Sequence, residues 1–192
     1  MSIINTKFEN KEGQKVPVVT FPIRANDDWT SRNTQEIFSG KTVVVFSLPG
    51  AFTPTCSSTH LPRYNELASK FSANGVDEII CVSVNDTFVM NAWAADQSAE
   101  NISFIPDGNR SWRYSMLVKD GVIEKMFIEP DLPGDPFEVS DADTMLEFIN
   151  PAAVQTTQVS LFTKPGCPHC ARAKDLLVQK GLQYEELTLG DE

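Results

Sequence analysis

The stretch Thr42-Val-Val-Val-Phe-Ser-Leu-Pro-Gly-Ala-Phe-Thr-Pro-Thr-Cys56 decides the fold. Its first half, Thr42–Leu48, is short, unbroken and β-branched, which is typical of a strand buried on both faces of a sheet. Pro49-Gly50 end that strand. Beyond Cys56, apolar residues recur at the spacing of one helix face, at Leu61, Tyr64, Leu67 and Phe71. We therefore predict a strand, a tight turn and a helix, with Cys56 where the helix begins.

The rest of the first 150 residues repeats this alternation of strands and helices. A second buried strand is expected at Glu78–Val84, and Asn85-Asp86-Thr87 then caps a helix that holds Phe88 and Trp93. Lys119-Asp120-Gly121 marks a hairpin, in which Gly121 supplies the positive φ that such turns need. The remaining predicted elements are the strands Tyr114–Val118 and Val122–Ile128 and the helix Ala142–Phe148. The alternation predicts an α/β layered fold, a mixed sheet flanked by helices.

The chain of 192 residues is predicted to hold two units. The polar segment 151–158 begins with a helix-stopping proline and lacks periodicity, so we interpret it as a linker between a domain at 1–150 and a second unit at 159–192. In that second unit, strands are expected at Val159–Phe162 and Tyr184–Leu189, with a loop and a helix between them. Because so short a unit buries little surface, we expect it to be the first part of a domain.

Composition and charge exclude several classes of function. Sixteen Lys and Arg against 26 Asp and Glu give a net charge of -10, which disfavours nucleic acid and anionic membranes as partners. Neither a secretion signal nor a membrane-spanning stretch is visible, so we expect a cytoplasmic, reducing setting. Four cysteines are too few for a disulfide scaffold, and each must be explained separately.

Cys56 carries the strongest chemical signal. The unpaired amides and the positive dipole end of a helix favour a thiolate over a thiol at its start. Three residues earlier, the Thr53 hydroxyl is placed to donate to a bound oxygen, and Pro49 and Pro54 stiffen the loop. The alternative is an inert, buried cysteine, but the neighbouring side chains are polar, as expected of a reactive site: Thr55, Ser57, Ser58 and Thr59.

The segment Pro49-Gly-Ala-Phe-Thr-Pro-Thr-Cys56-Ser-Ser-Thr-His-Leu-Pro62 resembles the active-site segment of the peroxiredoxins, specifically their type-five branch. The runs Val82–Trp93 and Arg113–Gly121 are similar to later segments of the same family. The resemblance implies a thioredoxin-like fold, peroxide as substrate and Cys56 as the peroxidatic residue. It also implies that Pro49, Thr53 and Arg113 surround Cys56.

The residue types agree with that chemistry. A thiolate that attacks a peroxide builds negative charge on the departing oxygen, and donors aimed at that oxygen lower the barrier. Arg113 is permanently charged and planar, although an arginine in an acidic protein also suits a surface salt bridge. We interpret His60 as structural. Cys81 lies within an apolar strand and is interpreted as a core residue, the alternative being a resolving thiol for Cys56.

The second pair of cysteines, in Cys167-Pro168-His169-Cys170, follows a predicted strand and opens a helix, which is the context of a dithiol redox motif. Together with Thr163-Lys164-Pro165-Gly166, the segment is similar to the glutaredoxins. The resemblance implies that Cys167 attacks, that Cys170 resolves, and that Lys164 and His169 contact glutathione. Half of a zinc site is the alternative, but the sequence has no second Cys or His pair to complete it. No metal is expected.

Together, the two units resemble hybrid enzymes in which a peroxiredoxin is fused to a glutaredoxin. This resemblance implies a glutathione-dependent peroxidase that reduces hydrogen peroxide and organic hydroperoxides, with glutathione as reducing co-substrate and no bound cofactor. A homodimer or higher homo-oligomer is expected. One alternative is a disulfide or deglutathionylation reductase that works through Cys167, and another is a catalytically impaired dimerisation module.

The chain departs from these families at two places. Only Pro106–Trp112 separate the predicted strand Ile102–Ile105 from Arg113, whereas a crossover between parallel strands needs a dozen residues or more. The placement of Arg113 is therefore left open. The sequence also stops at Glu192, before the segment in which glutaredoxins carry a cis-proline and a Gly-Gly turn that dock glutathione, so half of that site is expected to be missing.

Overall fold

The computed structural model describes residues 8–25, 28–108, 111–153, 159–164, 166, 168–179 and 184–188. The chain divides into two compact units, residues 1–153 and 154–192, and each is described by itself. Among the described residues, no helix is long and apolar enough to cross a membrane.

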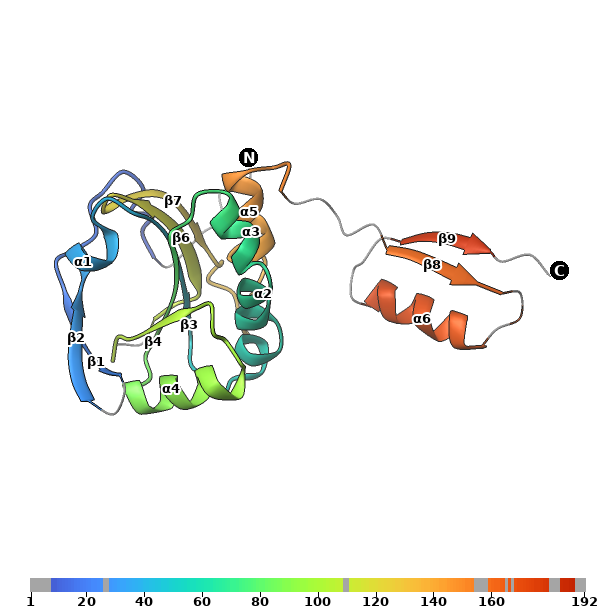
Figure 1. The fold of residues 1–192 in the computed structure, drawn as a ribbon, viewed down its shortest axis with the longest axis horizontal. Helices are drawn as coiled ribbons and strands as arrows, with labels where there is room; N and C mark the ends of the chain where they lie inside the picture. Colours follow the sequence, from blue (N-terminus) through green and yellow to red (C-terminus); the bar gives the residue numbers. More distant parts are fainter. Residues whose placement is uncertain are drawn as a thin grey trace. The chain divides into compact units, whose positions relative to one another are not determined.

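A five-stranded mixed sheet forms the centre of unit 1, in the order β5-β4-β3-β6-β7 (Figure 1). The strands β3, β4 and β5 are parallel, whereas β6 runs antiparallel to both β3 and β7. Their bounds are β3 Thr42–Leu48, β4 Glu78–Ser83, β5 Ser103–Pro106, β6 Tyr114–Lys119 and β7 Val122–Ile128. The predicted mixed sheet flanked by helices is confirmed.

Helices η1 (Cys56–His60), α2 (Leu61–Glu66), α3 (Ala68–Ala73) and α5 (Ala142–Ile149) lie on one side of this sheet, as Figure 1 shows. Phe46 of β3 points to them, because its ring stacks on Tyr64 of α2 with centroids 4.2 Å apart. Val43 and Val45 belong instead to a cluster with Ile37 and Phe38. The alternation along β3 explains the unbroken apolar run, since both faces of the strand are buried.

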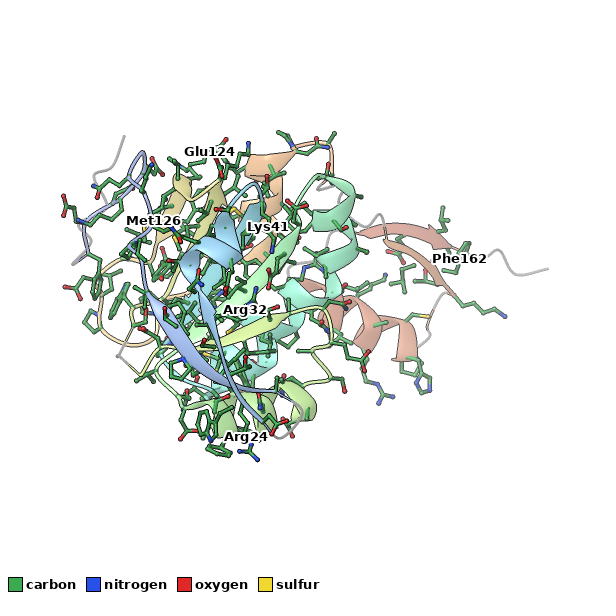
Figure 2. The ribbon with its side chains drawn as sticks, turned by 60° about the vertical axis from the view of Figure 1, so that its left-hand side comes forward. Arg24, Arg32, Lys41, Glu124, Met126 and Phe162 are labelled. Atoms are coloured by element: carbon green, nitrogen blue, oxygen red, sulfur yellow. The ribbon has the colours of Figure 1, made fainter. Side chains whose placement is uncertain are left out.

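The other side of the sheet carries a hairpin that the sequence did not predict. Its strands are β1 (Thr20–Ala25) and β2 (Asp28–Asn33), and the helix α1 (Thr34–Phe38) follows directly. Arg24 holds the hairpin to α4 (Thr87–Asp96), since its backbone N–H donates to Thr87 Oγ1 at 3.0 Å and its guanidinium lies over the Phe88 ring (Figure 2). Most residues of β2 are polar and β1 contains Pro22, so the alternation of Phe21 and Ile23 alone did not predict a hairpin.

Most predicted boundaries agree with the structure to within one or two residues. Asp120 and Gly121 both adopt positive φ, 45° and 75°, as the predicted turn between β6 and β7 requires. Asp86 is the N-cap of α4, and its side chain accepts from the Val89 N–H. The helix after Cys56 is less regular than predicted, because α2 ends before Leu67 and α3 begins after it.

The described residues of unit 2 form two parallel strands joined by one helix. These elements are β8 (Val159–Thr163), α6 (Pro168–Gln179) and β9 (Tyr184–Thr188). The Phe162 side chain of β8, labelled in Figure 2, is 60% exposed. This strand, helix and strand follow the order that the sequence predicts for the segment.

The connection that precedes Arg113 corrects one premise of the sequence analysis. It does not join parallel strands, because β6 runs antiparallel to β3 and therefore starts at the edge where β5 ends. The chain has to pass three strand spacings, about 14 Å, and residues 107–113 can reach about 23 Å when extended. The short connection therefore suffices to bring Arg113 to the start of β6.

Candidate active site

Cys56 is fully buried in the first helical turn after β3. The turn is wider than an α-helical one, because the N–H of Leu61 donates to the carbonyl oxygen of Cys56, five residues earlier. Such π-helical turns are rare and occur frequently at functional sites. The Ser57 N–H bonds to the Thr53 carbonyl oxygen at 3.0 Å, so the loop and the helix are continuous at Cys56.

Thr53 and Pro49 lie on the loop between β3 and this turn. The Thr53 hydroxyl donates to the Gly50 carbonyl oxygen at 2.8 Å. A hydroxyl has one proton, so in this arrangement Thr53 Oγ1 offers a bound peroxide an acceptor and not the donor that we predicted. Pro49 follows the last residue of β3 and is half-buried.

Arg113 is buried, with only 2% of its side chain exposed, immediately before β6. Its Nη1 lies 2.9 Å from His60 Nδ1, and its Nη2 donates to both carboxylate oxygens of Asp135, at 2.6 and 2.7 Å. Arg113 Nε is buried and has no hydrogen-bond partner among the described residues. The structure thus brings Arg113 to the turn that begins at Cys56, and the guanidinium that pairs with Asp135 is buried and not exposed at the surface.

His60 is the residue that joins the two parts of this site. Its Nε2 lies 3.3 Å from the Ser140 carbonyl oxygen, which can only accept, so Nε2 carries the proton and Nδ1 accepts from Arg113. Burial and the Arg113 charge lower the pKa of His60 to about 3, so the ring is neutral at physiological pH. His60 is thus a structural residue that orients the Arg113 guanidinium.

A buried carboxylate supports His60 from the other side. Glu129, just after β7, accepts from the Ser140 N–H at 2.8 Å and from the Ser140 hydroxyl at 2.7 Å. The Ser140 carbonyl oxygen in turn accepts from the Tyr64 hydroxyl at 3.0 Å as well as from His60. Glu129, Ser140, His60 and Arg113 thus form one continuous polar network.

Cys81 lies within β4 and is fully buried, as the core interpretation predicts. Burial raises the pKa of its thiol well above the ordinary value, and the nearby Cys56 adds to that effect. A thiol that resists deprotonation is a poor nucleophile, which disfavours the alternative of Cys81 as a resolving residue.

In unit 2, Lys164 and Cys170 line one cavity of about 600 Å³. Lys174 and Glu186 form an ion pair on its wall, with 2.5 Å between Nζ and Oε1. His169 is exposed, and it is not among the residues that line the cavity. Cys167 lies outside the described residues.

Three residues of the unit 1 site were not predicted from the sequence: Asp135, Glu129 and Ser140. Asp135 and Ser140 lie in the irregular segment between β7 and α5, and Glu129 is the first residue after β7. A fully buried glutamate needs partners, but the sequence carries no signal that Glu129 is buried.

Comparison with known proteins agrees with this geometry. Residues 11–146 match the Redoxin family and residues 159–192 match the Glutaredoxin family. A hybrid peroxiredoxin of Haemophilus influenzae is 61% identical over an alignment that covers 95% of this chain and 84% of the relative. A peroxiredoxin of Synechocystis is 49% identical, over 72% of this chain and 91% of its own.

Solved structures give the same result. Reduced Prx3 of Vibrio vulnificus in complex with hydrogen peroxide is similar with a TM-score of 0.69 and 39% identity, covering 73% of this chain and 99% of that one. A 1-Cys peroxiredoxin of Plasmodium falciparum has a TM-score of 0.69 and 32% identity, covering 74% of this chain and 99% of its own.

The alignment with the Haemophilus protein spans 203 positions, more than the 192 residues of this chain, so that relative carries residues that have no counterpart here. The shared segments nevertheless extend over both units. The chain therefore belongs to the Redoxin family and is a hybrid peroxiredoxin, a peroxide-reducing oxidoreductase that continues into a glutaredoxin-family segment.

Proposed function

We propose that the protein is a glutathione-dependent peroxidase in which Cys56 reacts with hydrogen peroxide and organic hydroperoxides. The observation that carries the proposal is the buried Arg113, held by His60 on the Cys56 turn, with an Nε donor that has no partner among the described residues. A buried donor without a partner is costly, and an anion formed beside it would offset that cost.

In the proposed reaction, the Cys56 thiolate attacks one peroxide oxygen, an S–O bond forms and the O–O bond breaks. The second oxygen leaves as water or alcohol after taking a proton from solvent, and Cys56 becomes a sulfenic acid. Arg113 stabilises the charge that builds on the departing oxygen, and Thr53 Oγ1 accepts a hydrogen bond from the peroxide hydroxyl. Pro49 excludes water from one side of the site.

Glutathione then attacks the sulfenic sulfur and releases water, which leaves a mixed disulfide on Cys56. Cys167 takes the glutathionyl group by thiol–disulfide exchange, and a second glutathione removes it as oxidised glutathione, with Cys170 available as resolving thiol. Lys164 and His169 are proposed to contact glutathione. Because both units belong to one chain, the exchange between them has a raised effective concentration.

The test is peroxide consumption in the presence of glutathione. Cys56→Ser should abolish it, whereas Cys81→Ala, which removes another buried thiol of the same unit, should retain most of it. Cys167→Ser should slow the reaction with glutathione but leave the first oxidation of Cys56 unchanged. Equal rates for wild type and Cys56→Ser would reject the proposal.

A second candidate is a deglutathionylation reductase that works through unit 2. The cavity around Lys164 and Cys170 favours it, because Lys164 lines the cavity and can attract a glutathione carboxylate, while Lys174 is paired with Glu186. Reduction of a glutathionylated peptide, measured in wild type and in Cys167→Ser, tests it. If Cys167→Ser leaves that rate unchanged, this second activity is rejected.

Self-association and a cytoplasmic setting are further parts of the proposal. Large apolar side chains are exposed on unit 1, among them Trp29 at 61% and Phe88 at 55%, and their rings contact each other edge to face. Exposed aromatic pairs of this kind are typical of interfaces, so we expect a homodimer or higher homo-oligomer. Sedimentation of wild type and of Trp29→Ser tests it, and a monomer at every concentration would reject it.

A further inference from the structure

Asp135, in the segment between β7 and α5, contacts the proposed site through a different Arg113 nitrogen from the one that meets His60. Its two carboxylate oxygens accept from Arg113 Nη2 at 2.6 and 2.7 Å. It also accepts from the hydroxyl of Thr55, the residue before Cys56. Asp135 is 44% exposed while Arg113 is 2% exposed, so a carboxylate at the surface holds a buried guanidinium and the Cys56 turn together.

The donors of Arg113 are divided among different partners. A guanidinium has five N–H donors on three nitrogens. Nη2 is bound to Asp135 and Nη1 to His60, whereas Nε has no partner among the described residues although it is buried. Phe137 fixes the plane as well, since the guanidinium carbon lies 5.3 Å from the centre of that ring. Two nitrogens are thus held in place and the third is left for another ligand.

Asp135 also supplies the negative charge that is paired with Arg113. The ionisable groups that surround this pair and Cys56 come from several elements: His60 of η1, Tyr64 of α2, Cys81 of β4 and Glu129 after β7. His60 is neutral because its pKa is lowered to about 3, and burial raises the pKa of both Tyr64 and Cys81. Glu129 accepts from the 138–140 backbone and from Ser140 instead.

The Asp135 carboxylate is ionised at neutral pH. Partial burial raises its pKa, but the hydrogen bonds from Arg113 and Thr55 and the Arg113 charge outweigh burial, so the pKa lies below its ordinary value. The pair is therefore a charged one throughout the range in which thiols titrate.

We propose that Asp135 is a positioning residue for peroxide reduction: it holds Arg113 by Nη2 so that Nε remains available at Cys56, and its charge moderates the positive potential there. This inference rests on the proposed roles of Arg113 and Cys56. It assigns two separable effects to Asp135, an orienting hydrogen bond and a negative charge.

Two substitutions separate these effects. Asp135→Asn keeps an oxygen for Arg113 Nη2 but removes the charge, whereas Asp135→Ala removes both. Asp143→Asn is the matched control, because Asp143 accepts from Arg63 with both oxygens at 2.7 Å, is 40% exposed, and lies outside the site. Cys56 is followed by quantifying its peptide after alkylation with iodoacetamide across pH, and by the rate of its oxidation by hydrogen peroxide.

In Asp135→Asn, the pH profile of Cys56 alkylation should shift down by about 0.5 to 1 pH unit, because the local potential becomes more positive. Its oxidation rate at neutral pH should stay within about threefold of wild type, since a hydrogen-bond acceptor for Nη2 remains. In Asp135→Ala, the oxidation rate should fall about tenfold or more, the equivalent of one lost orienting bond to a charged group. Asp143→Asn should change neither quantity.

An unmoved pH profile in Asp135→Asn, or an unchanged oxidation rate in Asp135→Ala, overturns the inference. Arg113→Gln separates this failure from failure of the proposed function. If Arg113→Gln is slow while both Asp135 variants behave as wild type, only the role of Asp135 is wrong. If Arg113→Gln reacts as fast as wild type, the proposed role of Arg113 itself fails.

Discussion

Replacing Glu129 with Gln removes the charge of a buried group that organises the Arg113 side of the site. One Glu129 oxygen accepts from the N–H groups of Val139 and Ser140 and from the Ser140 hydroxyl, at 2.7 to 2.9 Å. The other accepts from the Glu138 N–H at 2.8 Å. All four partners are donors, so both oxygens act as acceptors, as in an ionised carboxylate. A glutamine offers a single acceptor oxygen.

The expected cost follows from this count of donors. Glutamine keeps the three bonds of one oxygen, but its NH2 group then faces the Glu138 N–H, which costs about 1 to 3 kcal/mol. The three retained bonds also weaken, because bonds to a charged acceptor are about twice as strong as neutral ones. Burying a neutral amide costs less free energy than burying an ionised carboxylate, and this difference offsets part of the loss. We expect the free energy of unfolding of Glu129→Gln to fall by about 2 to 4 kcal/mol.

The assay is urea unfolding followed by tryptophan fluorescence, with the rate of Cys56 oxidation measured alongside. Glu138→Gln is the control, because the Glu138 side chain is exposed and only its backbone N–H meets Glu129. It should lie within about 0.5 kcal/mol of wild type. The oxidation rate of Glu129→Gln should fall as well, because Ser140 positions His60. If both variants unfold at the same urea concentration as wild type, the reasoning about Glu129 is refuted.

Three further predictions concern stability. The pKa of His60 is lowered to about 3 in the folded chain, so below about pH 6.5 the unfolded chain binds a proton at His60 that the folded chain does not bind. The free energy of unfolding should therefore be highest above about pH 6.5 and fall by up to about 1.4 kcal/mol per pH unit as the pH drops toward 3. Measured between pH 6.5 and 4.5, His60→Asn should flatten this slope. Tyr64→Phe keeps the stack on Phe46 but loses the hydrogen bond to Ser140, so denaturant titration should show the free energy of unfolding falling by about 1 kcal/mol. A fall of more than about 3 kcal/mol would contradict this. Asp86→Ala removes the N-cap of α4 and should lower the unfolding free energy by about 1 kcal/mol, which Asp86→Ser should largely restore; an unchanged midpoint in Asp86→Ala would count against the cap.

Local patterns predicted the elements that hold Cys56, because a buried strand needs an apolar run and a tight turn needs a residue that tolerates positive φ. The apolar run at Thr42–Leu48 reflects a strand covered on both faces, and Gly121 marks the β6–β7 turn through the positive φ that it adopts. The hairpin β1–β2 had a weaker signal, because β1 contains a proline, β2 is polar and largely exposed, and β1 owes its place to contacts with α4 and β5. Tertiary packing, and not local propensity, therefore determines that these two segments form strands.

The candidate site was predictable only in part for a related reason. Cys56 and Thr53 are neighbours in sequence, so their relation could be read from spacing. Arg113 comes to His60 because β6 pairs antiparallel with β3, whereas the sequence prediction rests on a parallel crossover. Asp135 and Glu129 reach Arg113 and Ser140 through the segment between β7 and α5, which has no periodicity to interpret. Long-range hydrogen bonds of this kind depend on topology, which the sequence pattern does not specify.

The wide turn that begins at Cys56 sets the rotational phase of the helix. Each residue of an α-helix turns the chain by about 100°, so adding or removing one residue between Cys56 and Leu61 would swing the thiol by that angle about the axis. Leu61 and Tyr64 are fully buried, so the later helix is fixed against the core. Cys56 would therefore undergo the whole rotation. The π-helical turn thus adjusts the rotation of the helix, so that its apolar residues face the sheet while Cys56 stays in the same buried turn as His60.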